Sequence, residues 1–187
     1  KTLFPYTTLF RSGELSANNF LNHFASQIHP GDRVIDFGCG TGRVARNFLA
    51  KGLHITLVDL CPNCLDPEIE LLLSLFPERI SFIETCLWNL PKEIEKADWV
   101  YCCDVLEHIP EKKIDFVLKS INSRNSKGGY FSIGLKEDVF GKTLNSSLHL
   151  CLQSKDWWDK KISSYWHIES SLADEEEKHF HCCVSLP

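Results

Sequence analysis

Short apolar runs alternate with stretches of helical periodicity along most of this chain. The runs are continuous rather than interleaved with polar residues, which is typical of strands covered on both faces of a sheet. They span residues 33–37, 54–58, 80–84, 99–103 and 130–135. Helices are predicted between them at 43–51, near 67–75 and at 111–123. This alternation predicts an α/β fold with a parallel sheet and right-handed crossovers.

Further elements are predicted at the two flanks. The spacing of apolar residues from Leu21 to Ile28 indicates a helix before the first strand, and Gly128-Gly129 is expected to break the chain before the strand at 130–135. A polar loop, a helix and two strands joined by an acidic turn complete the pattern, at 136–147, 155–165, 168–172 and 179–186. We expect a single domain over residues 13–187.

A glycine-rich turn closes the first strand, in the segment Val34-Ile-Asp-Phe-Gly-Cys-Gly-Thr-Gly42. Glycine lets the backbone turn at positive φ and lets a ligand approach, so a strand, this turn and a helix N-terminus form a ligand cradle. The dinucleotide pattern G-x-G-x-x-G needs a small residue at position 43, where Arg43 stands. An NAD-dependent oxidoreductase is therefore disfavoured.

An acid closes each of two further strands. Asp59 ends His54-Ile-Thr-Leu-Val-Asp59, at about the distance after the glycines at which α/β nucleotide-binding proteins hold a ribose. A carboxylate can accept from both ribose hydroxyls, although Asp59 could instead only cap the next helix. Asp104 ends the strand in Trp99-Val-Tyr-Cys-Cys-Asp-Val-Leu-Glu-His-Ile109.

In this order and spacing, the three segments resemble the class I S-adenosylmethionine (SAM) methyltransferases. Asp-x-Gly-x-Gly-x-Gly is similar to motif I of that family, and Val-Leu-Glu-His-Ile is similar to motif IV. The resemblance implies a Rossmann-like three-layer sandwich, with a mostly parallel seven-stranded sheet and an antiparallel C-terminal strand pair. It also implies that SAM is bound by Asp36, Phe37, Gly38, Gly40, Gly42, Asp59, Leu60, Cys86, Leu87 and Asp104.

The resemblance assigns roles within this set. Asp36 is expected to orient the loop and the methionine amino group of the cofactor, and Asp59 to hold the ribose. Many relatives carry an aspartate where Cys86 stands, and a thiol is a weak hydrogen-bond acceptor. The backbone near Leu87 and an apolar sandwich are therefore expected to hold the adenine.

Two histidines are catalytic candidates. His108 follows the motif IV strand, where a neutral imidazole could take a proton from a hydroxyl or amine acceptor; packing at the helix start is the alternative. His149 resembles a histidine often found after the fifth strand. With Asp104 and Glu107, these histidines could also form a metal site, as in RNA 3′-end methyltransferases. One carboxylate spacing fits such a site and the second histidine pair does not, so no metal is expected.

Motifs that are absent from the sequence restrict the class of methyl acceptor. No Asn-Pro-Pro-Tyr or Asp-Pro-Pro-Tyr segment follows the fourth strand, which disfavours methylation of amides and of exocyclic base nitrogens. No Pro-Cys nucleophile occurs there either, which disfavours methylation of pyrimidine C5. A net charge of −5 argues against broad phosphate binding, so a nucleic-acid partner is not expected. A small-molecule oxygen or nitrogen acceptor is left, with Trp88, Trp157 and Trp158 either framing its pocket or packing in the core. The alternatives are a SAM-binding protein without transfer activity, truncated or regulatory, and a metal-assisted RNA methyltransferase.

Composition suggests the compartment. The nine cysteines are interpreted as reduced thiols, and with no signal or membrane-spanning segment in the sequence they indicate a cytoplasmic protein without a membrane partner. A zinc site at Cys61 and Cys64 is disfavoured because no good partner pair exists. The chain has no methionine, and residues 1–12 resemble a translated sequencing-adapter remnant of a metagenomic reading frame. They are expected to be a non-native or disordered leader.

Overall fold

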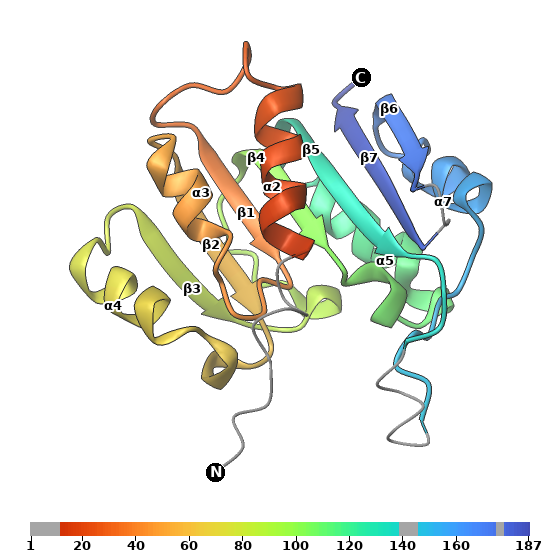
Figure 1. The fold of residues 1–187 in the computed structure, drawn as a ribbon, viewed down its shortest axis with the longest axis horizontal. Coiled ribbons are helices and arrows are strands. Elements are labelled where there is room, and N and C mark those ends of the chain that lie inside the picture. The colour runs from red at the N-terminus through yellow and green to blue at the C-terminus, as the bar shows by residue number, and fades with distance from the viewer. Residues whose placement is uncertain (1–11, 139–145, 175–177) are drawn as a thin grey trace.

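The computed structural model describes residues 12–138, 146–174 and 178–187. Seven strands form one sheet in the order β3-β2-β1-β4-β5-β7-β6 (Figure 1). Their bounds are β1 Arg33–Phe37, β2 His54–Asp59, β3 Ile80–Glu84, β4 Ala97–Cys103, β5 Asn125–Gly134, β6 His167–Ala173 and β7 His179–Ser185. Only β7 is antiparallel to its neighbours, β5 and β6. The predicted mostly parallel sheet with an antiparallel C-terminal pair is confirmed.

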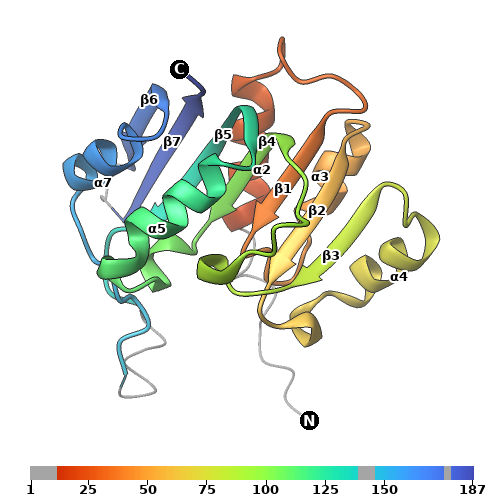
Figure 2. The same ribbon diagram turned by 180° about the vertical axis from the view of Figure 1, so that it is seen from behind.

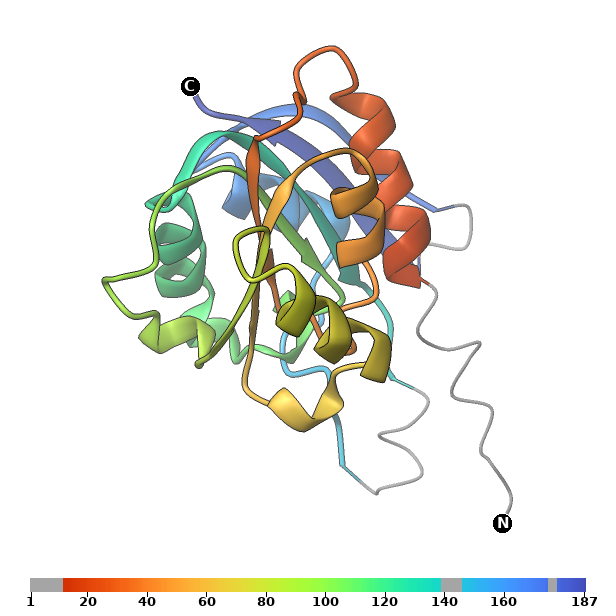
Figure 3. The same ribbon diagram turned by 90° about the vertical axis from the view of Figure 1, so that its left-hand side faces the viewer.

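Helices cover both faces of the sheet and complete three layers. One face carries α2 (Ser12–His23), α3 (Ala45–Ala50) and α4 (Pro67–Leu75); the other carries α5 (Glu111–Asn122) and α7 (Lys155–Ile162) (Figures 2 and 3). Short 3-10 turns follow β2, β3 and β4, at η1 (Pro62–Cys64), η2 (Leu87–Asn89) and η3 (Leu106–His108). None of the helices in the described part of the chain is long and apolar enough to cross a bilayer.

Each face of the sheet has its own apolar core. Successive strand residues point to opposite faces, so Val34 packs beneath α2 and α3 while Ile35 packs beneath α5. Aromatic rings dominate the first core, where the ring centroid of Phe20 lies 5.8 Å from that of Phe48 and 5.7 Å from that of Trp99. The second core is built on the helical stripe predicted for α5. The two cores therefore fix the strands in place, and with them the loops that follow the carboxyl ends of those strands.

Two expectations about boundaries need correction, and two others fall wholly or partly outside the described residues. Gly128 and Gly129 lie within β5 and do not break the chain, because β7 and β4 approach too closely for a side chain. A Cβ at Gly128 would lie 2.2 Å from the Val184 carbonyl oxygen, and one at Gly129 would lie 2.4 Å from the Val100 carbonyl oxygen. α2 ends at His23, before the predicted end of that helix. Of the expected leader, Ser12 begins α2 and residues 1–11 lie outside the described residues, as do 175–177 of the acidic turn.

The chain changes direction across the sheet beside β1. β2 and β3 extend the sheet on one side of β1, whereas β4 and β5 extend it on the other. The pair β1–β4 is therefore the topological switch point, and open α/β sheets bind ligands outside the carboxyl ends of the strands at such a point. The glycine turn leaves β1 at this edge, and Asp104 leaves β4.

We predict that Gly129→Ala destabilises the fold by about 1–3 kcal/mol, because the added methyl group would overlap the side chain and carbonyl of Val100. Urea denaturation followed by circular dichroism measures the loss. The control is Glu84→Ala at an exposed position of β3, which should change stability by less than about 0.5 kcal/mol. If Gly129→Ala were as stable as the wild type, the close approach of β4 and β5 would be incorrect.

Candidate functional site

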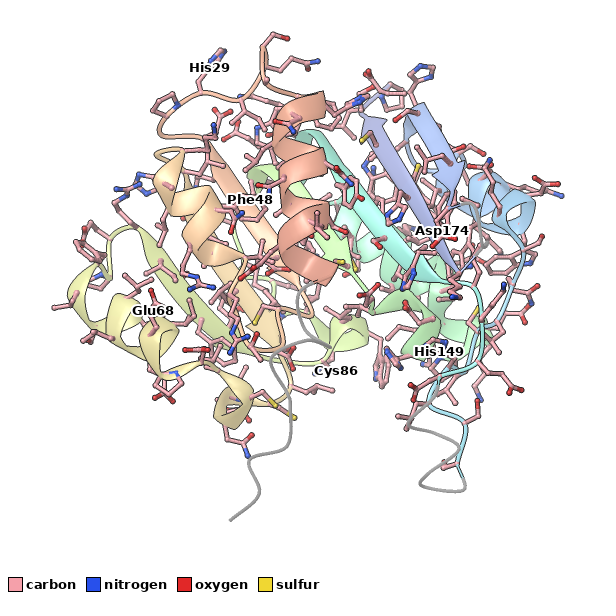
Figure 4. All side chains as sticks on the ribbon, viewed as in Figure 1. His29, Phe48, Glu68, Cys86, His149 and Asp174 are labelled. Atoms are coloured by element: carbon pink, nitrogen blue, oxygen red, sulfur yellow. The ribbon has the colours of Figure 1, made fainter. Side chains whose placement is uncertain are left out.

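Two adjoining cavities open at the carboxyl edge of the sheet. The first cavity, of about 340 Å³, is lined by Asp36, Tyr101, Cys103, Leu148 and His149, among others. The second cavity, of about 320 Å³, is lined by Asp59, Leu60, Thr85, Cys86, Leu87, Trp88 and Ile109, among others. Both share Gly38, Gly40, Asp104 and His108 in their walls. Figure 4 shows Cys86 and His149 at this edge and His29 at the opposite end of the sheet.

The glycine loop is shaped by close approach at one position and by open space at another. Gly38 has φ +78°, and a Cβ there would lie 2.3 Å from Val105 Cγ2 in the turn after β4. Gly40 has φ +50°, and a Cβ there would meet no atom within 4 Å. Gly38 thus lets the two loops pack together, whereas Gly40 leaves the floor of both cavities clear for a ligand.

Asp59 holds the glycine loop at the end of β2. Its Oδ2 accepts from the backbone N–H of Gly40 at 2.8 Å, and its Oδ1 accepts from the backbone N–H of Cys61 at 3.1 Å. The alternative that Asp59 caps the next helix is excluded, because Asp66 is the N-cap of α4 and accepts from Glu68 N–H. A carboxylate oxygen accepts more than one hydrogen bond, so Asp59 retains acceptor capacity toward the second cavity.

Asp36 is buried at the end of β1, with only 2% of its surface exposed. Burial, and secondarily the Asp59 carboxylate, raise the pKa of Asp36 to about 8. Burial also raises the pKa values of the neighbouring Cys39 thiol and Tyr101 phenol, so both stay uncharged near neutral pH. The first cavity therefore has an acidic group at its base that a cationic ligand would ionise.

Asp104 directly follows β4 and has a left-handed conformation, with φ +56°, which is uncommon for a residue other than glycine. Its backbone N–H donates to the Ser132 carbonyl at 2.9 Å, and its Oδ1 lies 3.8 Å from His179 Nε2 on β7. Asp104 lies in the walls of both cavities.

His108 and His149 come together although 40 residues separate them in sequence. Their ring centroids lie 4.9 Å apart in an edge-to-face arrangement, on the wall of the first cavity. His108 Nδ1 lies 2.9 Å from the Leu148 carbonyl oxygen, and His149 Nδ1 lies against the Lys136 carbonyl oxygen. Burial lowers the pKa of His149, which favours its neutral form. The alternative role for His108 was packing at the start of the helix. The side chain is exposed, so it is not simply packed there.

Most residues predicted to bind the cofactor line the two cavities, but Phe37 and Gly42 do not. The Phe37 side chain is fully buried beneath α5, because it points to the opposite face from Asp36. A Cβ at Gly42 would lie 3.0 Å from Ile69 Cγ2, so this glycine is needed for packing of the loop against α4. Contact between the other eight residues and a cofactor stays a prediction.

The three tryptophans do not form one pocket. Trp88 lines the second cavity and is 38% exposed, whereas Trp158 is fully buried under α7 with Trp157 packed edge-on against it. An aromatic substrate pocket made of all three is therefore wrong, and of the three only Trp88 lines either of these two cavities.

Several lining residues were not predicted from the sequence. Tyr101 donates to the Gly13 carbonyl at 2.8 Å and so attaches the start of α2 to the first cavity. Arg43, noted only as an obstacle to a dinucleotide motif, lines the same cavity and pairs with Asp66 at 2.8 Å. Thr85 and Ile109 line the second cavity. Their positions directly after β3 and within the motif IV segment were the available signal.

Sequence comparison identifies relatives of the chain. The family described as "Methyltransferase domain" matches residues 10–177. A curated relative, the ubiquinone biosynthesis O-methyltransferase of Xylella fastidiosa (strain 9a5c), is 33% identical over 86 residues, which cover 43% of this chain and 33% of that protein. The chain thus spans about a third of the length of this relative.

Two solved structures have a similar fold. Magnesium protoporphyrin IX methyltransferase from Synechocystis PCC 6803, with bound S-adenosylhomocysteine (SAH), has a TM-score of 0.72 at 16% identity, covering 95% of this chain and 85% of that chain. The 1,6-didemethyltoxoflavin-N1-methyltransferase of Burkholderia thailandensis has a TM-score of 0.69 at 18% identity, covering 94% and 78%. The family match over most of the sequence agrees with this fold, and the resemblance seen in the motifs is confirmed: the chain belongs to the methyltransferase domain family of class I.

Proposed function

We propose that this chain binds SAM across the two cavities and transfers its methyl group to an oxygen or nitrogen atom of a small acceptor. The observation that carries the proposal is the convergence of Asp36, Asp59 and Asp104 around the glycine loop at the switch point. The family match and the SAH-bound structures with the same fold support the choice of cofactor.

The residues present fit SAM. Asp36 at the base of the first cavity suits the methionine ammonium group, and the bare backbone at Gly40 gives the chain of the cofactor room to cross. Asp59 faces the second cavity with acceptor capacity for ribose hydroxyls. The apolar Leu60, Leu87 and Ile109 suit a flat base, and the thiol of Cys86 leaves recognition of its amino group to the backbone.

The chemical step requires little from the protein. When bound, SAM supplies a sulfonium methyl group that is already electrophilic. The chain has to hold the acceptor in line with that group and exclude water, and such positioning can supply about 7–11 kcal/mol. His108 and His149 are the groups proposed to act on the acceptor, because they lie in the first cavity beyond the glycine loop.

The acceptor is proposed to be a small molecule. The named curated relative is an O-methyltransferase, which supports an oxygen acceptor. The net negative charge of the chain disfavours a polyanionic acceptor. Isothermal titration with SAH tests cofactor binding, and incubation of labelled SAM with a small-molecule extract tests transfer. Binding of SAH without any labelled product would favour the alternative of a SAM-binding protein without transfer activity.

We predict that Asp59→Asn weakens SAH binding by about 1–3 kcal/mol, because the amide side chain cannot accept from both ribose hydroxyls and from Gly40 N–H. Calorimetric titration measures the change, and a thermal melt separates it from unfolding. Asp115→Ala on the exposed part of α5 is the control and should leave the affinity unaltered. Equal affinity of Asp59→Asn and wild type would show that Asp59 only holds the loop.

SAH binding should strengthen as the pH rises toward 8. Burial, and then the nearby Asp59, raise the pKa of Asp36 to about 8 in the free protein, so below that pH most of this carboxyl group is protonated. A bound ammonium group favours the ionised form, and the proton must then leave on binding. Titration in two buffers of different ionisation enthalpy measures this proton. Asp36→Asn should abolish its release, and a wild type that releases none would contradict the assignment.

We predict that His108→Ala lowers turnover by roughly 10²–10⁴-fold, the range typical of removing a group that acts on the transferred proton. The affinity for SAH should change far less than turnover, because His108 is not among the residues proposed to hold the cofactor. Initial rates with the identified acceptor and SAH titration give the two quantities. His29→Ala at the opposite end of the sheet is the control (Figure 4). If His108→Ala turned over normally, catalysis would come from positioning of the acceptor against the cofactor alone, and His108 would be structural.

A further inference from the structure

A Cys-x-x-Cys segment that the proposed mechanism does not use lies directly beside the cofactor site. Cys61-Pro62-Asn63-Cys64 follows the end of β2 and precedes α4 (Figure 1). All nine cysteines lie in the described part of the chain and are free thiols, and only Cys61 and Cys64 are exposed. A Cys-x-x-Cys segment next to a βαβ unit is typical of a redox motif. Burial in the core does not account for this pair.

The turn η1 brings the two thiols to the same side of the chain. Side chains three residues apart eclipse each other in a 3-10 turn, and the backbone N–H of Cys64 donates to the Cys61 carbonyl at 3.1 Å. Such a turn keeps its end Cα atoms within about 7 Å, and a disulfide spans Cα atoms up to about that distance. Pro62 restricts Cys61 to extended backbone, where its φ of −123° falls. Burial, and secondarily the nearby Cys61 thiol, raise the pKa of the Cys64 thiol.

The same turn is attached to the glycine loop at its start. Oδ1 of Asp59 accepts from the Cys61 N–H at 3.1 Å, while Oδ2 of the same carboxylate accepts from the Gly40 N–H at 2.8 Å. Leu60, between Asp59 and Cys61, lines the second cavity. A displacement of the Cys61 backbone is therefore passed directly to the carboxylate proposed to hold the ribose.

The far end of the turn is anchored by packing and by the backbone. Leu65 Cδ2 would lie 3.2 Å from a Cβ at Gly42, so this leucine packs directly against the glycine loop. The backbone N–H of Asp66 donates to the Thr41 carbonyl at 3.0 Å. At the other end, the attachment of Cys61 to the loop runs through a side chain that can rotate. Drawing the two sulfurs together therefore displaces the Cys61 end of the turn.

We propose that Cys61 and Cys64 form a reversible disulfide, and that closing it weakens the binding of the cofactor. An S–S bond of about 2.05 Å is much shorter than the contact between two free thiols, so Cys61 must move toward Cys64. This movement turns the Cys61 N–H away from Asp59 and disturbs the carboxylate that also holds Gly40. The effect on the cofactor rests on the proposed function, whereas formation of the disulfide does not.

The oxidant is a low-molecular-weight disulfide, R–S–S–R. One thiolate of the pair attacks a sulfur of this reagent, whose S–S bond breaks and releases the first R–S⁻. The other cysteine attacks the mixed disulfide, so that the Cys61–Cys64 bond forms and the second R–S⁻ leaves. The two protein thiols are oxidised, the reagent is reduced, and the two thiol protons pass to the released R–S⁻ groups. Burial raises the pKa values of Cys39, Cys103 and Cys151, so these thiols compete poorly.

Glutathione buffers test the disulfide on the full chain without any cofactor. The chain is equilibrated with oxidised or reduced glutathione, alkylated and digested, and mass spectrometry then identifies the bonds. We expect an internal Cys61–Cys64 bond in the oxidising buffer and two free thiols again after reduction. If both thiols stayed free in the oxidising buffer, or carried only separate glutathione adducts, the disulfide site would be overturned.

Titration with SAH compares the two redox states. Oxidation should weaken SAH binding by about 10-fold or more, the usual cost of losing one hydrogen bond to a charged group. The matched control is the double variant Cys61→Ser/Cys64→Ser, which keeps both backbone N–H groups and should show no difference between the two buffers. A thermal melt checks that each species is folded. Equal affinity of oxidised and reduced wild type, or a loss that persists in the double variant, would refute the effect on the cofactor.

Hydrogen exchange separates this inference from the proposed function, because it needs no SAH. Oxidation should speed exchange of the Gly40 and Cys61 amides, since both donate to the Asp59 carboxylate. Nuclear magnetic resonance of the isotope-labelled chain measures the rates. The Gly31 N–H, which donates to the Gly52 carbonyl, is the control and should exchange at an unchanged rate. Unchanged exchange at Gly40 and Cys61 would contradict the coupling, whereas a reduced chain that binds no SAH contradicts only the proposed function.

Discussion

Direct contact between the loop after β1 and the turn after β4 determines the geometry of the site. Gly38 and Val105 meet so closely that any side chain at position 38 would separate the two segments. Each segment is also tied to a neighbouring strand end, through Gly40 to Asp59 and through the Asp104 N–H to Ser132. The acids at the strand ends are thus positioned by the sheet, and the loops have little freedom to move them apart.

The carboxyl edge of the sheet contains two buried carboxyl groups, those of Asp36 and Glu107. Burying them costs free energy, so they do not contribute to the stability of the fold. Burial is the main cause that raises the pKa values of Asp36 and Glu107, in each case to about 8. Buried acids of this kind are common where a protein binds a cation or performs proton chemistry. One lies at the base of the first cavity and the other beside its histidine pair. A positive charge would reduce the desolvation cost at each position.

The sequence was sufficient for the fold and for the part of the cavity lining that lies at the strand ends, because strand runs, helical stripes and strand-end acids are local patterns. It was insufficient wherever a residue's role depends on a distant neighbour. Gly128 and Gly129 looked like a chain break, since nothing local reveals that Val184 and Val100 exclude a side chain there. The surroundings of Glu107 could not be predicted for a similar reason. Its partner His149 and its backbone donor Gly134 are brought to it only by the sheet.

The reversed direction of β7 has a practical consequence for measurement. Its first residue pairs with Gly134 at the edge that carries the cavities, and its last pairs with Gly128 at the other edge. The C-terminal residues therefore leave the sheet on the side away from the cavities (Figure 1). A linker attached after Pro187 can tether the chain to a sensor surface with both cavities facing the solution. Weak ligands can then be surveyed by flowing them past a single immobilised sample.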